Sequence, residues 1–371
     1  MKFYKIYKET RMCQDTQATQ ATQKKPKIIF ENLLFLAPLA GYTDLPFRKV
    51  VKRFGVDITV SEMISSHALA FSSAKTLKMI SKSPNETPFS VQIAGSKPDI
   101  ITKAIEVLNA QNDQNHIDIL DFNCGCPAPK VANHGNGSGL LKDLDLLVKC
   151  LNLIKEKTNA PYTSVKVRLG FDKKIPIEIA NALNDANVDF VVAHARTKAD
   201  AYKKERVDYN ALASMKRILS HPLIANGEID SPNKAREVLD FTGANGVMIG
   251  RAALKSPWIF WQIKQNLKSS AFSTKSSANF ANQELPKVIK REIVLEHFDS
   301  MIDFYGERGA IMFRKNLHAY AKGEEGASAF RNVINCITNP TSMREAIEEF
   351  FDSSFITSPL PQIIELNKKS V

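Results

Sequence analysis

The stretch Leu120-Asp-Phe-Asn-Cys-Gly-Cys-Pro-Ala-Pro-Lys130 is the most informative part of this chain. The apolar run that ends at Phe122 predicts a buried strand, and the cysteine-bearing turn after it leads into a glycine-rich segment, residues 133–140. Barrel enzymes present catalytic side chains on polar loops that follow buried strands. Cys126 is therefore the first candidate for a catalytic acid or nucleophile.

Outward from this stretch, short apolar runs alternate with helical patterns. Eight such units within residues 28–265 predict a parallel sheet, and their number favours closure into a TIM (β/α)8 barrel; an open doubly wound sheet is the alternative. Pro98 and Pro232 suit the first turns of helices, and Ser231 suits an N-cap. The expected strands are 33–37, 58–61, 89–93, 117–122, 163–167, 190–193, 223–225 and 246–249, and the expected helices include 98–110, 143–157, 176–187 and 231–240.

The segments outside this alternation differ in composition. Residues 1–27 are polar and rich in Gln and Thr, which predicts a disordered extension, and residues 266–284 predict a linker. Helical spacing returns over residues 285–352, which predicts a small all-helical domain before a C-terminal tail, residues 353–371. Its helices are expected from Val288 to Tyr305 and at about 310–322, 327–337 and 342–351.

Composition favours a cytoplasmic protein with no membrane association. No apolar stretch approaches the roughly 20 residues that span a bilayer, and no apolar core of a secretory signal follows Met1. The five cysteines are odd in number and scattered, which argues against a disulfide framework and for a reducing compartment.

The net charge of +11 is unevenly distributed. Residues 1–27 carry +5, residues 28–285 carry +7 and residues 286–371 carry −1. A basic surface favours phosphate-rich partners, although many soluble proteins with this charge bind no nucleic acid. Charge alone leaves that question open.

Polar side chains and glycines gather at the expected carboxyl ends of the strands, where barrel enzymes bind their ligands. Gly227 and Gly250 are small enough for backbone N–H groups to approach a phosphate, and Arg251 is a forked cation. Lys166 suits the electron-rich edge of a flavin. Each residue alone has an ordinary structural explanation, but seven on matching strand ends favour a site for a large, planar, phosphorylated ligand. The strand-end residues are Glu62, Gln92, Asn123, Lys166, His194, Asn226 and Arg251.

The pattern Asn123-x-Gly-Cys126-Pro-x-x-Lys130 resembles the active-site motif of the tRNA-dihydrouridine synthases, with Cys126 at the position of their catalytic cysteine. The segment Ala37-Pro-Leu-Ala-Gly-Tyr-Thr-Asp44 resembles their first flavin-contacting loop, with Leu39 where Met is usual. The resemblance runs from about residue 33 to 320 and is greatest to the bacterial B type.

This resemblance implies a TIM barrel that binds FMN, followed by a helical tRNA-binding domain. Lys130, Arg168 and Arg196 become candidate tRNA contacts near the mouth, and Arg314 and Lys315 become candidates in the helical domain. Asn316 departs from the family, which commonly has His there. The residues that match the family's FMN contacts are Pro38, Leu39, Ala40, Gln92, Asn123, Lys166, His194, Asn226, Gly227, Glu228, Gly250 and Arg251.

The resemblance also implies a reaction. NADPH (or NADH) would reduce FMN, flavin N5 would transfer hydride to C6 of a uridine in tRNA, and Cys126 would give a proton to C5. A thiol with an ordinary pKa of about 8.5 is mostly protonated at neutral pH, as an acid must be. Residues 123–141 form the catalytic loop, whose glycines 135, 137 and 139 are expected to let it close over the base.

Two other functions remain open from the residues. One is an FMN-barrel oxidoreductase that acts on a free small molecule, resembling dihydroorotate dehydrogenase; the other is an RNA-binding barrel without catalysis. Cys124 with Cys126 suggests a metal only weakly, because no Cys/His cluster completes a site, so no metal is expected and Cys124 is assigned to the loop wall. No obligate protein partner is indicated, and a monomer is expected.

Overall fold

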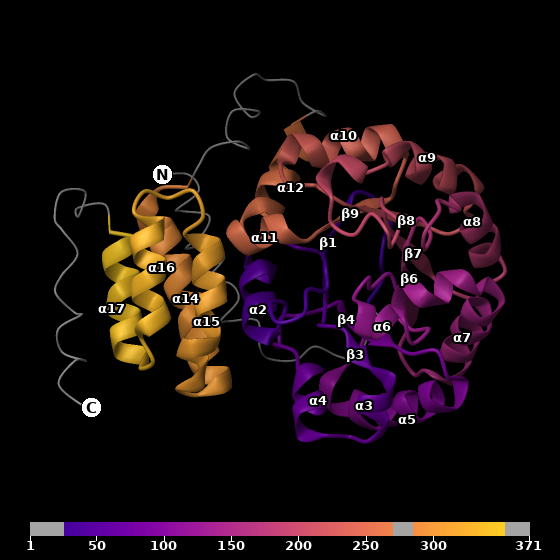
Figure 1. The fold of residues 1–371 in the computed structure, drawn as a ribbon, viewed down its shortest axis with the longest axis horizontal. Helices are drawn as coiled ribbons and strands as arrows, with labels where there is room; N and C mark the ends of the chain where they lie inside the picture. The colour runs from indigo at the N-terminus through magenta and orange to yellow at the C-terminus, as the bar shows by residue number, and fades with distance from the viewer. Residues whose placement is uncertain (1–25, 270–284, 353–371) are drawn as a thin grey trace. The chain divides into compact units, whose positions relative to one another are not determined.

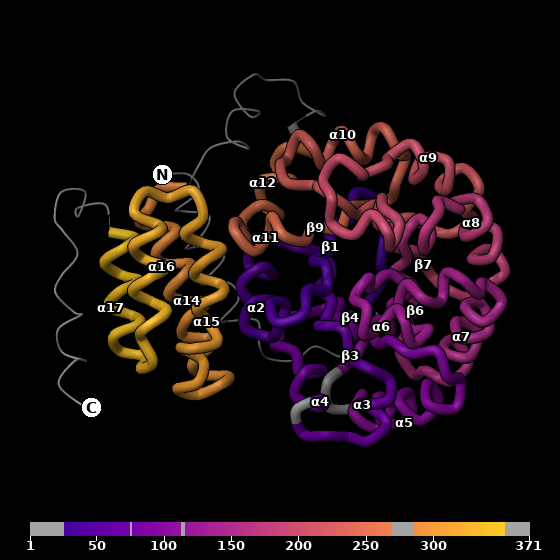
Figure 2. The backbone as a smooth tube through the Cα atoms, viewed as in Figure 1, coloured from indigo at the N-terminus to yellow at the C-terminus, as the bar shows by residue number. Residues whose placement is uncertain are grey.

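The structure, a computed structural model, describes residues 26–269 and 285–352. The chain forms two compact units that divide between residues 283 and 284 (Figures 1 and 2). Nearly all of the expected N-terminal disorder, most of the expected linker and the expected tail lie outside the described residues. In the part that is described, no helix is long and apolar enough to cross a membrane.

The first unit is a closed barrel. Among the described residues, parallel strands pair in the order β1-β2-β4-β5-β6-β7-β8-β9, and β9 pairs with β1 through Leu33 and Gly246. This closure confirms the predicted TIM barrel and excludes the open sheet. The strands are β1 (Leu33–Leu36), β2 (Ile58–Val60), β3 (Ile64–Ser65), β4 (Phe89–Ala94), β5 (Ile119–Cys124), β6 (Tyr162–Arg168), β7 (Phe190–His194), β8 (Leu223–Asn226) and β9 (Gly246–Ile249).

The second barrel strand is interrupted, which the sequence pattern did not predict. β2 and β3 both pair with β4, and residues 61–63 leave the ladder between them. The Ser61 hydroxyl fills part of this gap by accepting a hydrogen bond from the backbone N–H of Gln92 at 3.0 Å. The interruption places Glu62 where its carboxylate accepts a hydrogen bond from the N–H of Gly41, in the loop after β1.

Helices follow the strands around the barrel (Figure 1). Pro98 and Pro232 begin their helices as predicted, and the Ser231 hydroxyl caps its helix by accepting from the N–H of Lys234. α12 extends to Ser269, so the first residues of the expected linker are helical. The helices are α2 (Leu45–Arg53), α3 (Ser66–Ala70), α4 (Ala74–Met79), α5 (Pro98–Asn115), α6 (Pro129–Ala132), α7 (Leu144–Lys157), α8 (Pro176–Asn184), α9 (Tyr209–Ile218), α10 (Pro232–Thr242), α11 (Arg251–Lys255) and α12 (Ile259–Ser269), with short 3-10 helices η1 (Gly137–Lys142) and η2 (Lys204–Arg206).

Strand alternation decides which side chains face the barrel interior. An apolar cluster of residues from the barrel strands includes Phe35, Ile119 and Phe190 and fills part of the barrel interior. Since alternate residues of a strand share a face, Asp121 and Asn123 point inward with Ile119. Cys124 points outward toward Cys150 of α7, and burial together with Cys150 raises the pKa of its thiol. Cys124 therefore lies between the sheet and a helix, which corrects its assignment to the loop wall.

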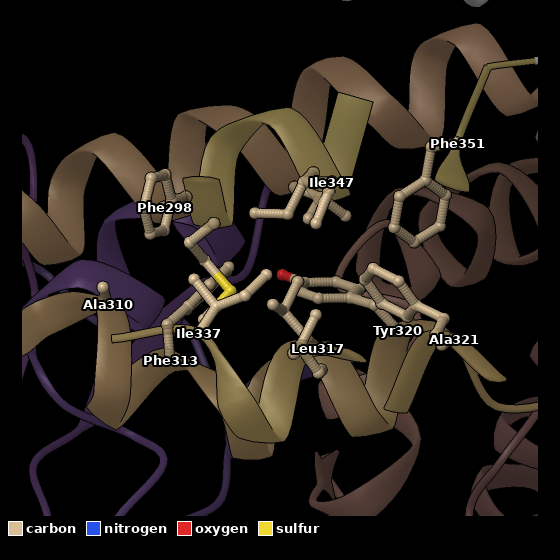
Figure 3. Close-up of a cluster of buried hydrophobic side chains, with 14 of the residues drawn as sticks. Phe298, Ala310, Phe313, Leu317, Tyr320, Ala321, Ile337, Ile347 and Phe351 are labelled. Carbon is tan, nitrogen blue, oxygen red and sulfur yellow. The ribbon is translucent and has the colours of Figure 1, made fainter. Parts of the chain in front are cut away.

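The second unit is helical, as predicted, with four helices among the described residues. They are α14 (Lys287–Tyr305), α15 (Arg308–Tyr320), α16 (Ala327–Cys336) and α17 (Pro340–Phe350). Their shared core includes Phe298, Phe313 and Ile347 (Figure 3). The Phe330 ring stacks on Phe350 with centroids 4.0 Å apart. This separate core is what allows the unit to fold around its own apolar contacts.

Candidate active site

A cavity of about 540 Å³ opens at the carboxyl ends of the barrel strands. All twelve expected cofactor residues line it, together with Cys126, Arg168 and Arg196. Lys130 is exposed on α6 and does not line the cavity, and Arg314 and Lys315 lie on α15 of the second unit. The lining residues expected from the sequence are Pro38, Leu39, Ala40, Gln92, Asn123, Cys126, Lys166, Arg168, His194, Arg196, Asn226, Gly227, Glu228, Gly250 and Arg251.

A continuous chain of hydrogen bonds connects the barrel interior to the catalytic turn. Gln92 Nε2 donates to Asp121 Oδ2 at 2.6 Å, and Asn123 Nδ2 donates to Gln92 Oε1 at 2.8 Å. Asn123 Oδ1 then accepts from the backbone N–H groups of Gly125 and Cys126, at 3.2 and 2.9 Å. The chain thus holds the backbone of the cysteine that the sequence singled out.

The direction of this chain is fixed at both ends. Backbone N–H groups only donate, so Asn123 Oδ1 must accept and its Nδ2 must donate. At the other end a carboxylate only accepts, so Gln92 must turn its Nε2 toward Asp121. Each amide nitrogen carries a second hydrogen, and both side chains line the cavity. Gln92 and Asn123 are therefore suited to present donors, not acceptors, to a ligand.

Asp121 is a site residue that sequence reasoning missed. It lies inside an apolar-looking run, and only the period-two alternation from Asn123 could have shown that it faces inward. The Ser164 hydroxyl also donates to it, at 2.6 Å. Burial raises its pKa to about 6, although the bonds from Ser164 and Gln92 favour the carboxylate.

Lys166 is the cation at the floor of the cavity. Its ammonium donates to Asn226 Oδ1 at 3.1 Å, and Asn226 Nδ2 donates to the carbonyl of Met248 at 2.7 Å. Burial and, secondarily, Arg168 lower the pKa of Lys166 to about 8, while Asp121 opposes this shift. Asn226 on β8, which is itself held by β9, therefore positions the Lys166 ammonium. The nearby Asp121 carboxylate favours the charged form of this ammonium.

His194 is neutral at physiological pH. Burial and the surrounding cations lower its pKa well below the ordinary value. Its Nε2 lies 3.2 Å from a guanidinium nitrogen of Arg196, which can only donate. Nε2 must therefore accept, which places the ring proton on Nδ1.

Glu228 joins two arginines at the rim of the cavity. Its Oε1 accepts from Arg196 at 2.7 Å and also from Arg251. Glu228 has a left-handed backbone with φ of 49°, next to Gly227 with φ of 128°. A side chain at Gly227 would meet the His194 ring at 3.1 Å, so only glycine fits here. The geometry brings the two expected phosphate loops, after β8 and β9, together through one carboxylate.

Arg168 and Arg196 are more deeply buried than their expected role as tRNA contacts suggested. Arg168 donates to the carbonyls of Gly125, Thr197 and Ala201, so it ties the loops after β5 and β7. Arg196 is fully buried and donates to Lys203 as well as to Glu228. Both hold the mouth in shape, and contact with substrate remains a prediction for them.

The catalytic loop is packed against its own cysteine. Cys126 is half-buried, and its carbonyl accepts from both the hydroxyl and the N–H of Ser138, at 2.8 and 3.2 Å. A side chain at Gly137 would come within 3.1 Å of Cys126 Cβ, and one at Gly139 within 2.5 Å of the Ala132 carbonyl. These two glycines are needed for close packing; closure of the loop over a base remains a prediction.

Three further residues that line the cavity were not named as site residues from the sequence. Met63 lies in the interruption between β2 and β3, which the pattern did not predict. Tyr202 is 59% exposed. The Cζ atoms of Arg168 and Arg251 lie 5.5 and 5.8 Å from the centroid of its ring. Leu254, on α11, adds an apolar wall. Met63 and Tyr202 come from irregular segments, where spacing gives no signal.

The residues present suit a flavin mononucleotide. The cavity volume lies in the range of cofactor pockets. Gln92 and Asn123 offer donors and Lys166 offers a cation. Gly227 and Gly250, next to Arg251, carry no side chains of their own that would keep a phosphate from their backbones. A metal has less support, because among the described residues no group of three or more His, Cys, Asp and Glu side chains is close enough to bind one.

The fold and site define a TIM-barrel oxidoreductase with a cofactor cavity at the barrel mouth and one thiol at its edge. The family model described as "Dihydrouridine synthase (Dus)" matches residues 35–355, and the chain belongs to this family of flavin-dependent oxidoreductases.

Relatives cover almost the whole chain. It is 61% identical over 338 residues to a protein of Helicobacter pylori named "Probable tRNA-dihydrouridine synthase", covering 91% of this chain and 98% of the relative. It is 37% identical over 326 residues to "tRNA-dihydrouridine synthase B" of Vibrio vulnificus, covering 87% and 97%. The corresponding protein B of Pseudomonas aeruginosa is 35% identical over 323 residues, covering 86% and 93%.

Proposed function

We propose that this protein reduces uridine in tRNA to 5,6-dihydrouridine, with FMN as its cofactor and NADPH as its hydride donor. The single observation that carries the proposal is the hydrogen-bond chain from Asp121 through Gln92 and Asn123 to the N–H of Cys126. This chain places the side-chain amides of Gln92 and Asn123, which would bind the cofactor, and the Cys126 thiol in one site. The names of the relatives support the same reaction.

The cavity residues divide into a flavin-binding group and a substrate-binding group. When bound, FMN supplies the hydride that is transferred to C6 of the uracil ring. Gln92 and Asn123 would donate to the ring system, and Lys166 would neutralise its anionic edge. The loops at Asn226-Gly227 and Gly250-Arg251 would hold the phosphate, with Arg251 oriented by Glu228.

Cys126 would hold the proton that is delivered to C5. Its thiol lies at the cavity, and its backbone is fixed by Asn123 on one side and Ser138 on the other. A positioned acid of this kind contributes about 10²–10⁴ in rate. A target uridine must leave the RNA stack to enter a cavity of this depth.

The second unit and the rim would bind the rest of the tRNA. Arg314 donates to the Ile337 carbonyl at 2.6 Å, which leaves part of its guanidinium for a phosphate, and Lys315 neighbours it on α15. Lys130 projects from α6 near the turn of Cys126. We infer that the protein acts as a monomer in the cytoplasm, where its substrate is found, without an obligate protein partner.

The test is a direct assay of the purified protein. The released chromophore should be FMN by reverse-phase chromatography, and an unmodified tRNA transcript should gain dihydrouridine when NADPH is supplied. Turnover of free orotate or dihydroorotate in place of tRNA would support the small-molecule oxidoreductase. Absence of flavin after reconstitution would support the RNA-binding barrel without catalysis.

A further inference from the structure

Two lysine ammonium groups share one aromatic ring at the barrel mouth. Lys142 Nζ lies 3.8 Å from the centroid of the Phe171 ring, and Lys198 Nζ lies 4.5 Å from the same centroid. The two ammonium groups are therefore no more than 8.3 Å apart. They come from different loops: Lys142 ends η1, Phe171 follows β6 and Lys198 follows β7. None of the three lines the cavity.

Backbone hydrogen bonds fix this Lys142–Phe171–Lys198 cluster. The N–H of Lys198 donates to the Gly170 carbonyl at 2.9 Å, and the N–H of Ala199 donates to the Phe171 carbonyl at 3.0 Å. These bonds extend the β6–β7 pairing beyond the barrel. Gly170 has φ of 145°, and a side chain there would come within 1.9 Å of the Lys173 carbonyl. The ring and Lys198 are thus held by the backbone, not by flexible side chains.

Within residues 26–269 and 285–352, no carboxylate neutralises the charges of the cluster. Among the described residues, no carboxylate lies within 4 Å of either ammonium. Two other lysines of the same loops are paired: Lys174 with Asp208 at 2.6 Å and Lys204 with Asp230 at 3.9 Å. The face of an aromatic ring attracts cations and so offsets part of their mutual repulsion, and an anion between them would remove the rest.

The cluster is connected to the turn of the catalytic cysteine through η1. Ser138 contacts the Cys126 carbonyl, and η1 continues from Ser138 to Lys142. Four residues of 3-10 helix span about 8 Å. The expected FMN phosphate loops follow β8 and β9, whereas this cluster follows β5, β6 and β7. The anion it suits is therefore not the cofactor's phosphate.

We propose that Lys142 and Lys198, held on Phe171, bind a backbone phosphate of the tRNA beside the nucleotide that enters the cavity. This rests on the proposed function, because it takes tRNA as the ligand. The contact carries no base specificity; it fixes the register in which the strand crosses the mouth. The ordinary explanation, that the lysine stems merely cover an apolar ring, predicts no effect on RNA binding.

The test is the salt dependence of tRNA binding by the holoenzyme. The double variant K142Q/K198Q removes both charges and keeps side chains long enough to cover Phe171. The slope of log affinity against log salt, measured with an unmodified tRNA transcript from 50 to 200 mM salt, should become shallower by about 0.7–0.9, since the two lysines together neutralise one phosphate. The matched control is K149Q, which removes the charge of an exposed lysine on α7; its slope should equal that of the wild-type protein.

An unchanged slope in K142Q/K198Q, or the same change in K149Q, would overturn the proposal. So would a rise in the KM for NADPH with an unchanged tRNA slope, because the cluster would then bind the dinucleotide. Formation of dihydrouridine by the wild-type protein is scored separately. A failure of the proposed function therefore appears in that assay, while the phosphate contact is judged by binding slopes alone.

Discussion

Asp121 acts on its site in two ways. Its carboxylate orients Gln92, and its charge favours the protonated form of Lys166. The first effect needs an acceptor oxygen and the second needs a negative charge. Replacement by Asn keeps an acceptor for Gln92 and lets the Ser164 hydroxyl accept instead of donate. Asp121→Asn therefore isolates the effect of the charge.

Asp121→Asn should move the alkaline limit of activity to lower pH. Lys166 loses its proton near pH 8 even with Asp121 in place, and removing the carboxylate lowers that pKa further. The measurement is the pH profile of flavin reoxidation by tRNA. Asp118→Asn is the matched control, because Asp118 accepts from Phe89 on β4 and is not among the charges that shift Lys166. An Asp121→Asn profile identical to the wild-type profile would contradict this role.

The titration of Asp121 also makes the stability of the fold depend on pH, and ionisation of this carboxyl lowers that stability. The folded protein raises the pKa of Asp121 from 3.8 to about 6, so it binds this proton more tightly than the unfolded chain does. Stability from this group is fully present below pH 4 and decreases as the pH rises toward 6. A neutral Asn at this position therefore costs little stability at neutral pH.

At the scale of elements, the catalytic loop depends on η1 packing against α6. Gly139 lies so close to the Ala132 carbonyl that a Cβ would be 2.5 Å from it, and backbone cannot yield as a side-chain end does. Gly135 in the same loop has room, with Ser96 Oγ at 3.7 Å, but has φ of 76°. Substitution of Gly139 therefore tests the close packing, whereas substitution of Gly135 tests only the left-handed backbone conformation.

Gly139→Ala should lower the free energy of unfolding by about 1–3 kcal/mol, as overpacking does, and should slow flavin reoxidation because Ser138 no longer holds Cys126. Gly135→Ala, the control, should cost only about 1 kcal/mol, from its left-handed backbone. Denaturant unfolding and stopped-flow reoxidation measure the two quantities. Equal effects of both variants would show that the close contact at Gly139 is unimportant.

The sequence pattern predicted strands and helices well because their signals are local. The expected strand 246–249 agrees with β9, and the first-turn position of Pro98 and the N-cap at Ser231 are confirmed. The break between β2 and β3 was missed because it depends on the Ser61 hydroxyl bonding another strand. Asp121 was missed for a similar reason: its role depends on Gln92 and Ser164, which are distant in sequence.

At the scale of the whole molecule, the chain consists of two units with separate apolar cores. The barrel has its own apolar interior, and the helical unit has another around Phe313 and Phe330. The basic charge lies in residues 1–27 and in the barrel region, residues 28–285, whereas residues 286–371 carry a net −1. We therefore expect any contribution of the helical unit to RNA binding to come from particular residues and from its shape, not from net charge.

Removal of residues 286–371 should leave flavin binding intact and abolish reduction of tRNA. The cavity-lining residues all lie between Ala37 and Leu254, so the flavin site should survive. Flavin content by absorbance and dihydrouridine formation, compared with the full chain, measure both effects. A truncated protein that reduces tRNA at the full rate would require another role for the helical unit.

The central claim, that Cys126 delivers a proton to uridine, is tested most directly by stopped-flow reoxidation of the flavin by tRNA. Cys126→Ala should bind FMN and accept hydride from NADPH normally, but its reoxidation by tRNA should be about 10²–10⁴ times slower. Cys124→Ala is the matched control, because that thiol points away from the cavity toward Cys150. The account predicts a near wild-type rate for Cys124→Ala. A wild-type rate in Cys126→Ala, or a slower rate in Cys124→Ala than in Cys126→Ala, would contradict it.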